Sequence, residues 1–558
     1  MTKRPFLWAL KQVKNRLPSI LLMTLAQVGN AIFAVLFALG TRGVIDSVQL
    51  SDRQAFLQAC IWQGLIIAAI LICLCVQRHL RDRLHADLER DWKRRLLHGL
   101  LHGDYASVSA YHSGELLNRL NNDVNRVNDG ILNIIPNAAA MITRLIAALI
   151  VLGALDVWFA LIIVVLGVVV IVATALMRRW LKDLNKQVNQ QDGKVSSFLQ
   201  EIMEKLLMVQ TMNVSKEVER RADVLLNERY VIQRKRKNVS LATNMGISAM
   251  YHVAGFFALV WCAGRMLMGQ MSFGSLTAVI QLVNQLQTPF VNLTGIVPQY
   301  VATVASAERL MELEKLQGVP DVDNEDLCAL YEAMDAICAD DVCFSYDRDR
   351  ILEKASFVIP KGSFCAITGS SGIGKSTLLK LLLGVFKLES GEIYLQSGNT
   401  KLPMNRSMCR IFAYVPQGNL LLSGTVRENL MIVRPGATEE EIQQAIYVSA
   451  MDEYLGQLPD GLNTMLGESG AGLSEGQAQR LAIARAILGG APVLLLDEST
   501  SALDDQTEKT VLQRIRELKD RTCIAVTHRS AAMELCEWRL DIQEGQIVVR
   551  RSNTASIL

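Results

Sequence analysis

The sequence predicts a membrane protein in two parts, a helical transmembrane domain followed by an α/β domain. The chain has 558 residues, 50% of them hydrophobic, and its mean hydropathy of +0.23 exceeds that of most soluble proteins. Long apolar stretches occupy the first half, whereas the second half alternates β-rich runs with helical patterns. The net charge of +2 gives no reason to expect nucleic acid as a partner.

The N-terminus begins basic and becomes apolar, as a signal peptide does, but it lacks a short apolar core with a small-residue cleavage site. The apolar part continues to about Gly40, which is long enough to span a membrane. We therefore expect a surface helix over Leu10 to Arg16, followed by a retained membrane anchor. The 11 cysteines show no C-x-x-C spacing and are expected to be reduced, buried thiols rather than metal ligands.

Stretches long enough to cross the hydrocarbon layer predict six spans, each needing roughly 20 mostly apolar residues. They lie at about 18–40, 55–77, 132–155, 157–177, 246–268 and 275–298, within a transmembrane domain of residues 1–311. Basic residues precede the first span and follow the second and fourth, while the other short loops carry few. The positive-inside rule therefore places both termini in the cytosol.

Two charged stretches between spans, about 78–131 and 178–245, are expected to continue the membrane helices into the cytosol. Beyond the spans, an acidic linker at 312–334 leads to an α/β domain at 335–558. Its β-rich runs, "SFCAITG", "GEIYLQ", "RIFAYVPQ", "PVLLLDE" and "TCIAVTH", predict a parallel sheet. Thr438 and Glu441 form a capping-box pattern, which predicts a helix start in an inserted helical subdomain.

"GSSGIGKST" fits the phosphate-binding loop pattern G-x-x-x-x-G-K-[ST] and lies between a strand-like run and a helical one. Backbone N–H groups of such a loop approach phosphate, Lys375 reaches the β and γ phosphates, and Ser376 offers a hydroxyl to Mg²⁺. "PVLLLDE" resembles a buried strand with acids at its end, so we expect Asp497 on the metal side and Glu498 to polarise the attacking water.

Six motifs carry a family resemblance, in this order: "GSSGIGKST", "YVPQ", "LSEGQAQR", "VLLLDEST", "SALD" and "VTH". This order is similar to that of the nucleotide-binding domain of ABC transporters. With six predicted spans before that domain, the full chain resembles an exporter-type ABC half-transporter, of the kind that exports drugs, lipids or peptides. The resemblance implies a P-loop NTPase fold with a helical subdomain, the cofactors ATP and Mg²⁺, and a second half-transporter as partner.

The resemblance also implies site residues. Glu498, Gln417 and His528 would be catalytic, and Ser376, Gln417 and Asp497 would hold the metal. The nucleotide would contact Tyr346, Gly369, Ser370, Ser371, Gly372, Gly374, Lys375, Ser376, Thr377, Ser474, Gly476, Gln477 and Asp504. In this family, the signature helix that begins near Ser474 caps ATP on the P-loop of the opposite copy. Ser474 and Gln477 also fit a capping box, and both roles can hold.

Three departures from the family pattern lie near the signature. Glu475 stands where glycine is commonest, Ala478 replaces a basic residue, and "GESGAG" lacks the usual arginine beside Glu468. The negative charge of Glu475 is expected to weaken phosphate capping slightly. Because the acid and the histidine are both present, the chain does not resemble the inactive member of an asymmetric pair.

Coupling of hydrolysis to the membrane is expected at two stretches, 104–124 and 201–214, which match the family's coupling helices. In the spans, Arg144 is expected to face protein or water, and His252 is expected to be a satisfied buried histidine. A polar stripe on the last span fits either a central cavity or contacts between helices; it comprises Gln281, Asn284, Gln285, Thr288 and Asn292.

The sequence therefore predicts ATP-driven export of a small molecule, lipid or peptide by half of a dimeric transporter, with a homodimer favoured over a heterodimer. The alternatives are an importer of exporter-like fold, for instance for metal chelates, and an ATP-gated channel or regulatory subunit. A soluble ABC ATPase is disfavoured by the six spans. The expected location is the bacterial inner membrane, in contact with lipid, with the N-terminus and the ATPase domain in the cytosol.

Overall fold

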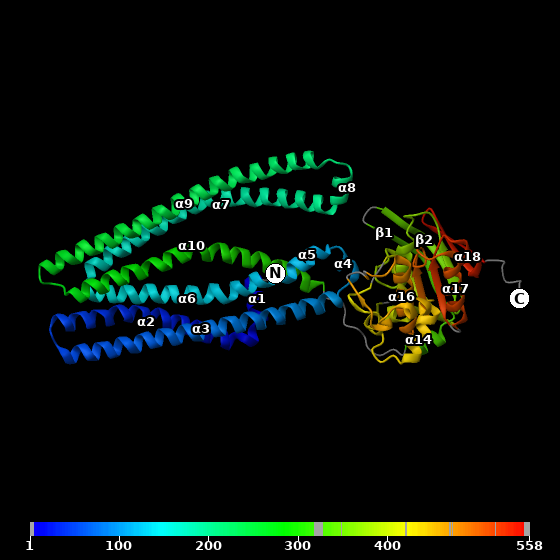
Figure 1. The fold of residues 1–558 in the computed structure, drawn as a ribbon, viewed down its shortest axis with the longest axis horizontal. Coiled ribbons are helices and arrows are strands. Elements are labelled where there is room, and N and C mark those ends of the chain that lie inside the picture. The colour runs from blue at the N-terminus through cyan, green and yellow to red at the C-terminus, as the bar shows by residue number, and fades with distance from the viewer. Residues whose placement is uncertain are drawn as a thin grey trace. The chain divides into compact units, whose positions relative to one another are not determined.

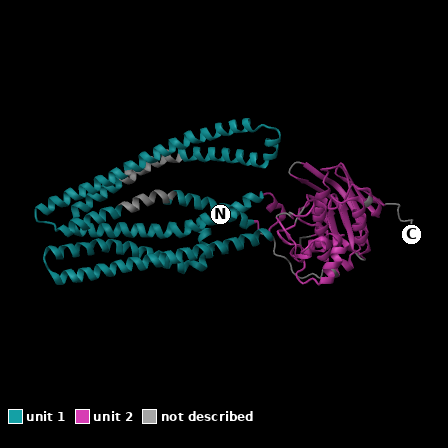
Figure 2. Ribbon diagram, viewed as in Figure 1, with its two compact units in different colours: residues 1–101, 112–315 teal, residues 102–111, 316–558 magenta. Residues whose placement is uncertain are grey.

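The computed structural model describes residues 5–316, 327–346, 349–404, 406–418, 421–467, 470, 472–518 and 521–551, apart from the side chains at 170–182, 247, 287–295, 297, 406–407 and 531. The chain forms two compact units, shown in Figure 2. Unit 1 comprises Met1–Leu101 and His112–Lys315, and unit 2 comprises His102–Tyr111 and Leu316–Leu558. The second unit thus includes a short segment from between two helices of the first.

Unit 1 is helical throughout its described length (Figure 1). Its elements are α1 (Pro5–Gln12), η1 (Lys14–Arg16), α2 (Leu17–Gln49), α3 (Arg53–Leu101), α5 (Ser113–Asn118), η2 (Arg119–Asp123), α6 (Val124–Leu155), α7 (Val157–Glu204), α8 (Leu206–Thr211), α9 (Ser215–Leu267) and α10 (Phe273–Lys315). Each predicted span lies within one of the long helices, except that the span at 246–268 extends one residue beyond the end of α9. The expected surface helix begins earlier than predicted, at Pro5, and ends at Gln12.

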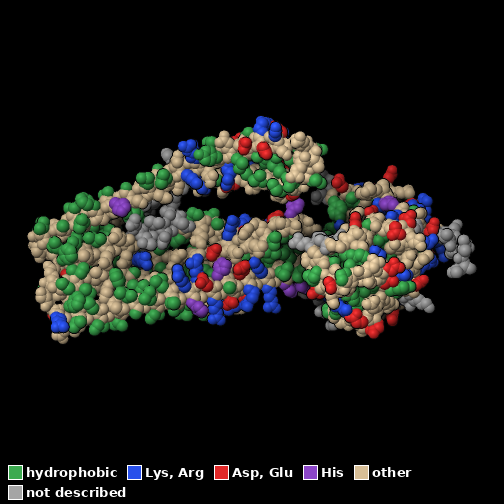
Figure 3. All heavy atoms as spheres, in the orientation of Figure 1, with side chains coloured by type: hydrophobic (Ala, Val, Ile, Leu, Met, Phe, Trp, Pro, Cys, Tyr) green, Lys and Arg blue, Asp and Glu red, His purple; other side chains and the backbone are tan. Residues whose placement is uncertain are grey.

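The apolar halves of the long helices expose large side chains outward, among them Leu21, Ile61, Trp62 and Leu65. Figure 3 shows hydrophobic side chains over the half of unit 1 where few charges occur, with most Lys, Arg, Asp and Glu side chains on the other half. Among the described residues, Lys14–Gln49, Arg53–Leu101, Ser113–Leu155 and Ser215–Leu267 are long and apolar enough to cross a membrane. The full number of spans stays a prediction.

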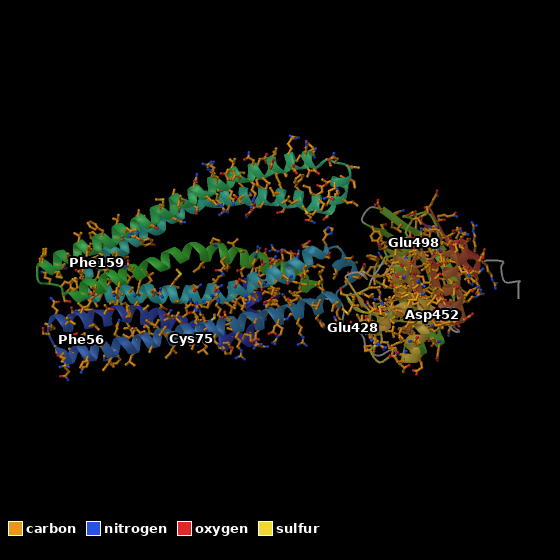
Figure 4. The ribbon with its side chains drawn as sticks, viewed as in Figure 1. Phe56, Cys75, Phe159, Glu428, Asp452 and Glu498 are labelled. Carbon is orange, nitrogen blue, oxygen red and sulfur yellow. The ribbon has the colours of Figure 1, made fainter. Side chains whose placement is uncertain are left out.

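Hydrogen bonds to Asp156 and an aromatic contact join the helices at the apolar end of unit 1. Asp156, between α6 and α7, accepts hydrogen bonds from the Phe159 backbone N–H and from Trp261 Nε1 of α9, each at 3.1 Å. Phe159, labelled in Figure 4, stacks on Phe257 with ring centroids 6.2 Å apart. These contacts fix the turn between α6 and α7 against α9.

The charged stretches of unit 1 form helices as expected. α3 continues to Leu101, and α7 and α9 run side by side to α8 (Figure 1). The segment after α3 instead breaks into short pieces: Asp104 caps α4 (Tyr105–Ser109), and a π-helical turn, η2, leads into α6. A π-turn is rare and marks a local departure from regular helix packing.

Unit 2 contains two main sheets in its described part. The central sheet has the order β12-β11-β3-β10-β9-β6 and parallel pairing from β11 to β6. Its strands are β3 (Phe364–Thr368), β6 (Phe412–Val415), β9 (Val493–Asp497), β10 (Thr522–Val526), β11 (Trp538–Gln543) and β12 (Gln546–Arg551). The prediction of a parallel sheet is confirmed for β3, β6, β9 and β10, and the structure adds β11, which pairs in parallel with β3, and β12, which pairs antiparallel with β11.

The prediction that "GEIYLQ" belongs to the parallel sheet is wrong. It lies in β4 (Ser390–Ser397) of an antiparallel sheet of order β2-β1-β4-β5, together with β1 (Ala336–Tyr346), β2 (Asp349–Pro360) and β5 (Thr400–Pro403). The run alone could not distinguish the two sheets because strand pairing is set by distant partners. β1 supplies the pairing here, with Ile337 opposite Leu395.

Helices complete unit 2 and cover both faces of the central sheet. The two apolar cores contain alternate residues of one strand, for example Leu494 on one face and Leu495 on the other. Beyond α4, the helices are α11 (Leu327–Ala333), α12 (Lys375–Leu382), α13 (Val426–Met431), α14 (Glu439–Val448), α15 (Asp452–Gln457), α16 (Glu475–Leu488), α17 (Asp505–Glu517) and α18 (Ser530–Leu535), with the short elements η3 (Arg406–Ile411), β7 (Gly424–Thr425), η4 (Gly461–Asn463) and β8 (Met465–Leu466). The predicted capping box of Thr438 and Glu441 is confirmed at the start of α14.

Candidate functional site

The phosphate-loop pattern lies between β3 and α12, at the C-terminal edge of the parallel sheet. Three glycines of this loop have positive φ: +148° at Gly369, +79° at Gly372 and +111° at Gly374. Residues that carry a side chain rarely adopt this backbone conformation. A Cβ on Gly374 would lie only 2.2 Å from Ile351 Cγ2. Lys375 is 6% exposed, and its ammonium donates to the Gly369 and Ser370 carbonyls at 3.0 Å. The loop is therefore tightly folded around its lysine.

The next residue, Ser376, faces the end of strand β9. Its Oγ donates to Asp497 Oδ1 at 2.9 Å, and the hydroxyl of Tyr414 donates to Asp497 Oδ2 at 3.0 Å. Asp497 is 2% exposed, so both carboxylate oxygens are held by named donors. A hydroxyl and a carboxylate held together are oxygen ligands of the kind that Mg²⁺ prefers. The residues present thus fit the expected ion.

Tyr414 was missed in the sequence, although it lies within the quoted motif "YVPQ". Burial raises the pKa of its hydroxyl, and the neighbouring Asp497 carboxylate raises it further. The phenol therefore stays protonated and remains a donor to Asp497. A buried tyrosine usually finds such a partner, but no local pattern says which one.

Glu498, labelled in Figure 4, directly follows Asp497, the last residue of β9. Its φ of +48° is left-handed, which is uncommon for a residue with a side chain and occurs disproportionately at functional sites. Gln417 Nε2 donates to Glu498 Oε2 at 2.9 Å. The structure thus joins two predicted catalytic residues from different strand ends directly. His528 is exposed after β10, and no hydrogen bond links its side chain to either of them among the described residues.

The signature helix α16 begins with the predicted capping box. Ser474 Oγ accepts from Gln477 N, and the Gln477 side chain accepts from Ser474 N. Ser474 is exposed, and within the described residues its side chain bonds only inside this box. Ser474, at the start of α16, is therefore exposed and bonds no other element in the described part of the chain.

Two neighbours of Ser474 have packing explanations that the sequence did not reveal. A Cβ on Gly476 would lie 2.9 Å from the Ala502 carbonyl oxygen, so the glycine allows α16 to approach the "SALD" loop closely. Ala478 is 1% exposed within the apolar core, where a basic side chain would be buried. Glu475 is exposed.

Hydrogen bonds join the "SALD" loop to α16 and to Arg529, the residue after His528. Gln479 of α16 bonds Ser501 Oγ and the Ala502 N–H, at 3.2 and 3.0 Å. Arg529 Nη1 donates to the Leu503 carbonyl at 2.5 Å and to fully buried Glu508 at 3.2 Å. Asp504 accepts from Thr507 N and caps α17, and this backbone bond lowers the pKa of its carboxyl.

Tyr346 belongs to an aromatic cluster in unit 2. Its ring meets those of Phe344 and Phe386 edge-on, at centroid distances of 5.0 and 5.5 Å, and it remains 39% exposed. Tyr105 of α4 packs on the same Phe386 at 6.0 Å. The Asp104 N–H also donates to the Leu316 carbonyl at 3.3 Å. Tyr105, near the start of the first predicted coupling segment, and Tyr346 thus contact the same ring.

In unit 1, three of the predicted polar residues each have a buried side-chain atom without a hydrogen bond among the described residues. Arg144 Nε, Gln281 Oε1 and Gln285 Oε1 are buried without a hydrogen bond in the described part of the chain. Gln285 Nε2, however, donates to the Ala34 carbonyl of α2 at 2.6 Å, so this side chain joins two helices. Asn284 is exposed, and Thr288 and Asn292 lie outside the described side chains. His252 is exposed rather than buried, which corrects the prediction, because α9 turns it away from its neighbours.

Comparisons with known proteins agree with these motifs. The family model "ABC transporter transmembrane region" matches residues 17–290, and "ABC transporter" matches residues 352–501, so together they cover most of the chain. The chain belongs to the ABC transporter family. A bacterial Atm1-family ABC exporter with ATP bound has the same fold, with a TM-score of 0.78 and 22% identity over 96% of this chain and 94% of that one.

Curated relatives of this ABC transporter come from bacteria and a plant. An ATP-dependent lipid A-core flippase of Shewanella oneidensis is 32% identical over 70% of this chain and 65% of its own length. The flippase of Vibrio vulnificus is 28% identical over 80% and 76%. A mitochondrial ABC transporter B family member 24 of Arabidopsis thaliana is 32% identical over 67% of this chain and 56% of its own length.

These findings establish an ATP-hydrolysing membrane transporter whose transmembrane and nucleotide-binding regions are fused in one chain. It has the exporter fold, and the relatives favour export over the importer alternative.

Proposed function

We propose that two copies of this chain form one exporter, in which the exposed start of α16 in each copy completes the ATP site of the other. The open end of α16 supports this proposal. Ser474 bonds only inside its capping box among the described residues, although a helix N-terminus with an extra hydroxyl suits a terminal phosphate. A second copy would supply the missing phosphate-bearing surface.

In the proposed site, the loop from Gly369 to Thr377 holds the phosphates, with Lys375 at the β and γ groups. Ser376, Asp497 and Gln417 would hold Mg²⁺, which neutralises charge that develops during phosphoryl transfer. Glu498 orients and deprotonates the attacking water, and Gln417 positions Glu498 through the hydrogen bond of 2.9 Å. His528 would contact the γ-phosphate, Tyr346 would stack on adenine, and Asp504 would link the two sites.

On the transport side, we propose that the cargo carries a polar, preferably anionic, group. Arg144 has no ion pair or hydrogen bond among the described residues, and an unpaired cation inside a membrane helix is costly. The flippase relatives are named for a lipid substrate. Export of an amphipathic molecule from the cytosolic side of a bacterial inner membrane fits both observations.

A complementation experiment tests the shared ATP sites. Two variants, Lys375→Ala and Ser474→Arg, are co-expressed with different affinity tags, and mixed dimers are isolated by both tags. If the sites are shared, the mixed dimer contains one fully intact site, because both substitutions fall in the other. We therefore expect ATP turnover well above that of either variant alone.

If each chain completed its own site, no intact site would exist in the mixed dimer and its turnover would stay at the level of the single variants. Dimers of the doubly substituted chain with wild type provide the matched control. They carry the same two substitutions, but shared sites would then each contain one of them.

A further inference from the structure

A cavity of about 410 Å³ lies in unit 1 between the N-terminal helices and α3. Its walls come from α1, η1 and the charged part of α3, and include Gln12, Asn15, Arg16, Trp92, Arg94 and Arg95. None of the predicted ATP-site or cargo residues lines it. Its chemistry therefore has to be explained separately.

The walls carry hydrogen-bond donors that lack acceptors. Trp92 is 3% exposed, and its Nε1–H has no hydrogen-bond partner among the residues that the structure describes. Arg95 donates to the side-chain oxygen of Gln12 and lies over the Trp92 ring, 5.7 Å from its centroid, but no carboxylate pairs with it in the described residues. Arg94 is exposed and likewise has no ion pair there. A buried donor without an acceptor costs free energy that a ligand can recover.

The acids nearby are already engaged. Asp91 lines the cavity but pairs with Arg16 at 3.4 Å and with Arg90 at 3.3 Å. Asp87 pairs with Arg16 at 3.3 Å. Among the described residues, therefore, no carboxylate forms an ion pair with Arg94 or Arg95. Two guanidinium groups beside an indole N–H form a donor set that matches a phosphate group.

The cavity adjoins the apolar surface of the bundle. Arg16 is followed directly by α2, whose first turns expose Leu17, Leu21 and Leu25. Figure 3 shows the change along unit 1 from charged to hydrophobic side chains. A phosphate in the cavity could thus be attached to acyl chains lying on these leucines. Basic pockets beside membrane helices on the cytosolic side are known places for anionic lipid headgroups.

We propose that this cavity is a binding site for the phosphate headgroup of an anionic phospholipid of the cytosolic leaflet. Arg94, Arg95 and the Trp92 N–H hold the phosphate, and the exposed leucines of α2 hold the acyl chains. The leaflet follows from the proposed orientation of the chain. Binding itself does not depend on ATP turnover, so the site can be tested independently of the transport proposal.

The experiment is a titration of the full-length protein in neutral detergent with phosphatidylglycerol, and with phosphatidylcholine for comparison, followed by native mass spectrometry. Wild type is expected to bind phosphatidylglycerol in preference to phosphatidylcholine. The double variant Arg94→Gln/Arg95→Gln is expected to bind its first phosphatidylglycerol about tenfold more weakly, from the contribution of each basic residue near an anionic lipid.

The matched control is Arg81→Gln/Arg83→Gln, which removes the same charge from exposed positions of α3 outside the cavity. Equal weakening in both double variants, or none in the cavity variant, would overturn the proposal. Displacement of the lipid by glycerol phosphate alone would also overturn it and assign the cavity to a soluble phosphate. If the double variant does not fold, Trp92→Phe, which removes only the N–H donor and part of the ring, replaces it.

Discussion

At the scale of single residues, the proposed ATP site is organised by hydrogen bonds to two adjacent acids. Asp497 accepts from Ser376 and Tyr414, and Glu498 accepts from Gln417. Each acid is thus fixed by side chains from other elements. The two acids bond different partners, so neighbouring residues can serve different roles, and Glu498 adopts a left-handed backbone of the kind found disproportionately at functional sites.

Replacing Tyr414 by Phe tests its role in positioning Asp497. The loss of one charge-assisted hydrogen bond, worth about 1.5–3 kcal/mol, should leave the carboxylate less well placed for Mg²⁺. We expect the Mg²⁺ concentration for half-maximal ATP turnover to rise about tenfold, with little change in kcat at saturating Mg²⁺. Mn²⁺ binding measured by electron paramagnetic resonance should weaken in parallel.

The matched control is Tyr447→Phe, which removes an exposed hydroxyl in the same unit. An unchanged Mg²⁺ requirement in the Tyr414 variant, or an equal change in the control, would show that the hydrogen bond to Asp497 does not position the metal side.

At the scale of elements, α16 is held against the "SALD" loop by both contact and hydrogen bonding. The close approach at Gly476 and the two bonds of Gln479 join the signature helix to the segment that leads into α17. The start of α16 and the neighbouring loop are therefore in direct contact. Sequence reasoning assigned Gly476 to phosphate binding alone.

Substituting Gly476 by Ala separates packing from phosphate binding. The added methyl group would approach the Ala502 oxygen too closely, and overpacking of this kind costs about 1–3 kcal/mol. We expect a lower thermal unfolding temperature together with lower ATP turnover. Gly436→Ala, where a Cβ meets nothing within 4 Å, is the control. Lost turnover with unchanged thermal stability would favour the phosphate role instead.

A second element contact joins η2 to α10. Asp123 is fully buried and accepts from Arg309 Nε at 2.7 Å and Ser306 Oγ at 2.8 Å, while Arg119 donates to the Arg309 carbonyl at 2.9 Å. Burial opposes the charge of Asp123, but the bonds from Arg309 and Ser306 outweigh it and lower the pKa of this carboxyl. The irregular π-turn thus places a carboxylate where α10 can bind it.

Asp123→Asn should destabilise unit 1 by about 3 kcal/mol, because it leaves a partly buried guanidinium without its acid. A lowered pKa means that the ion pair stabilises wild type above the ordinary aspartate pKa and that this stabilisation is lost as pH falls below about 4. We therefore expect the two proteins to differ in thermal unfolding temperature at neutral pH and to converge in acid. Asp129→Asn, at a half-exposed carboxylate on α6, should show neither effect.

At the scale of the whole molecule, the division into two units makes the short segment of residues 102–111 informative. It belongs by packing to unit 2 although it lies between helices of unit 1, and Tyr105 contacts the cluster that contains Tyr346. A covalent link from membrane helices thus enters the nucleotide-binding unit beside the predicted adenine contact. This arrangement suits coupling of nucleotide binding to transport.

ATP turnover by this chain purified alone in lipid nanodiscs tests whether one kind of chain suffices. We expect turnover that falls about 10²-fold or more in Glu498→Gln, the range for losing a general base. Glu453→Gln, at an exposed acid of the same unit, should keep wild-type turnover. Wild-type turnover no higher than that of the Glu498 variant would point to a different chain as the second half.

The sequence by itself determined the fold class, the long helices and the order of the ATP-site motifs. Apolar length predicts helices that cross a membrane, and residues in a phosphate loop or a helix cap act through their own backbone neighbours. Such local features need no knowledge of distant partners.

Only the tertiary structure decided the remainder, because it depends on residues far apart in the chain. The antiparallel pairing of β4, the hydrogen bond of Tyr414 to Asp497, the packing at Gly476 and the cavity that Arg94 and Arg95 line with residues of the N-terminal helices each join segments with no common local pattern. Strand order and side-chain contacts are set by how the whole chain packs, so no single motif specifies them.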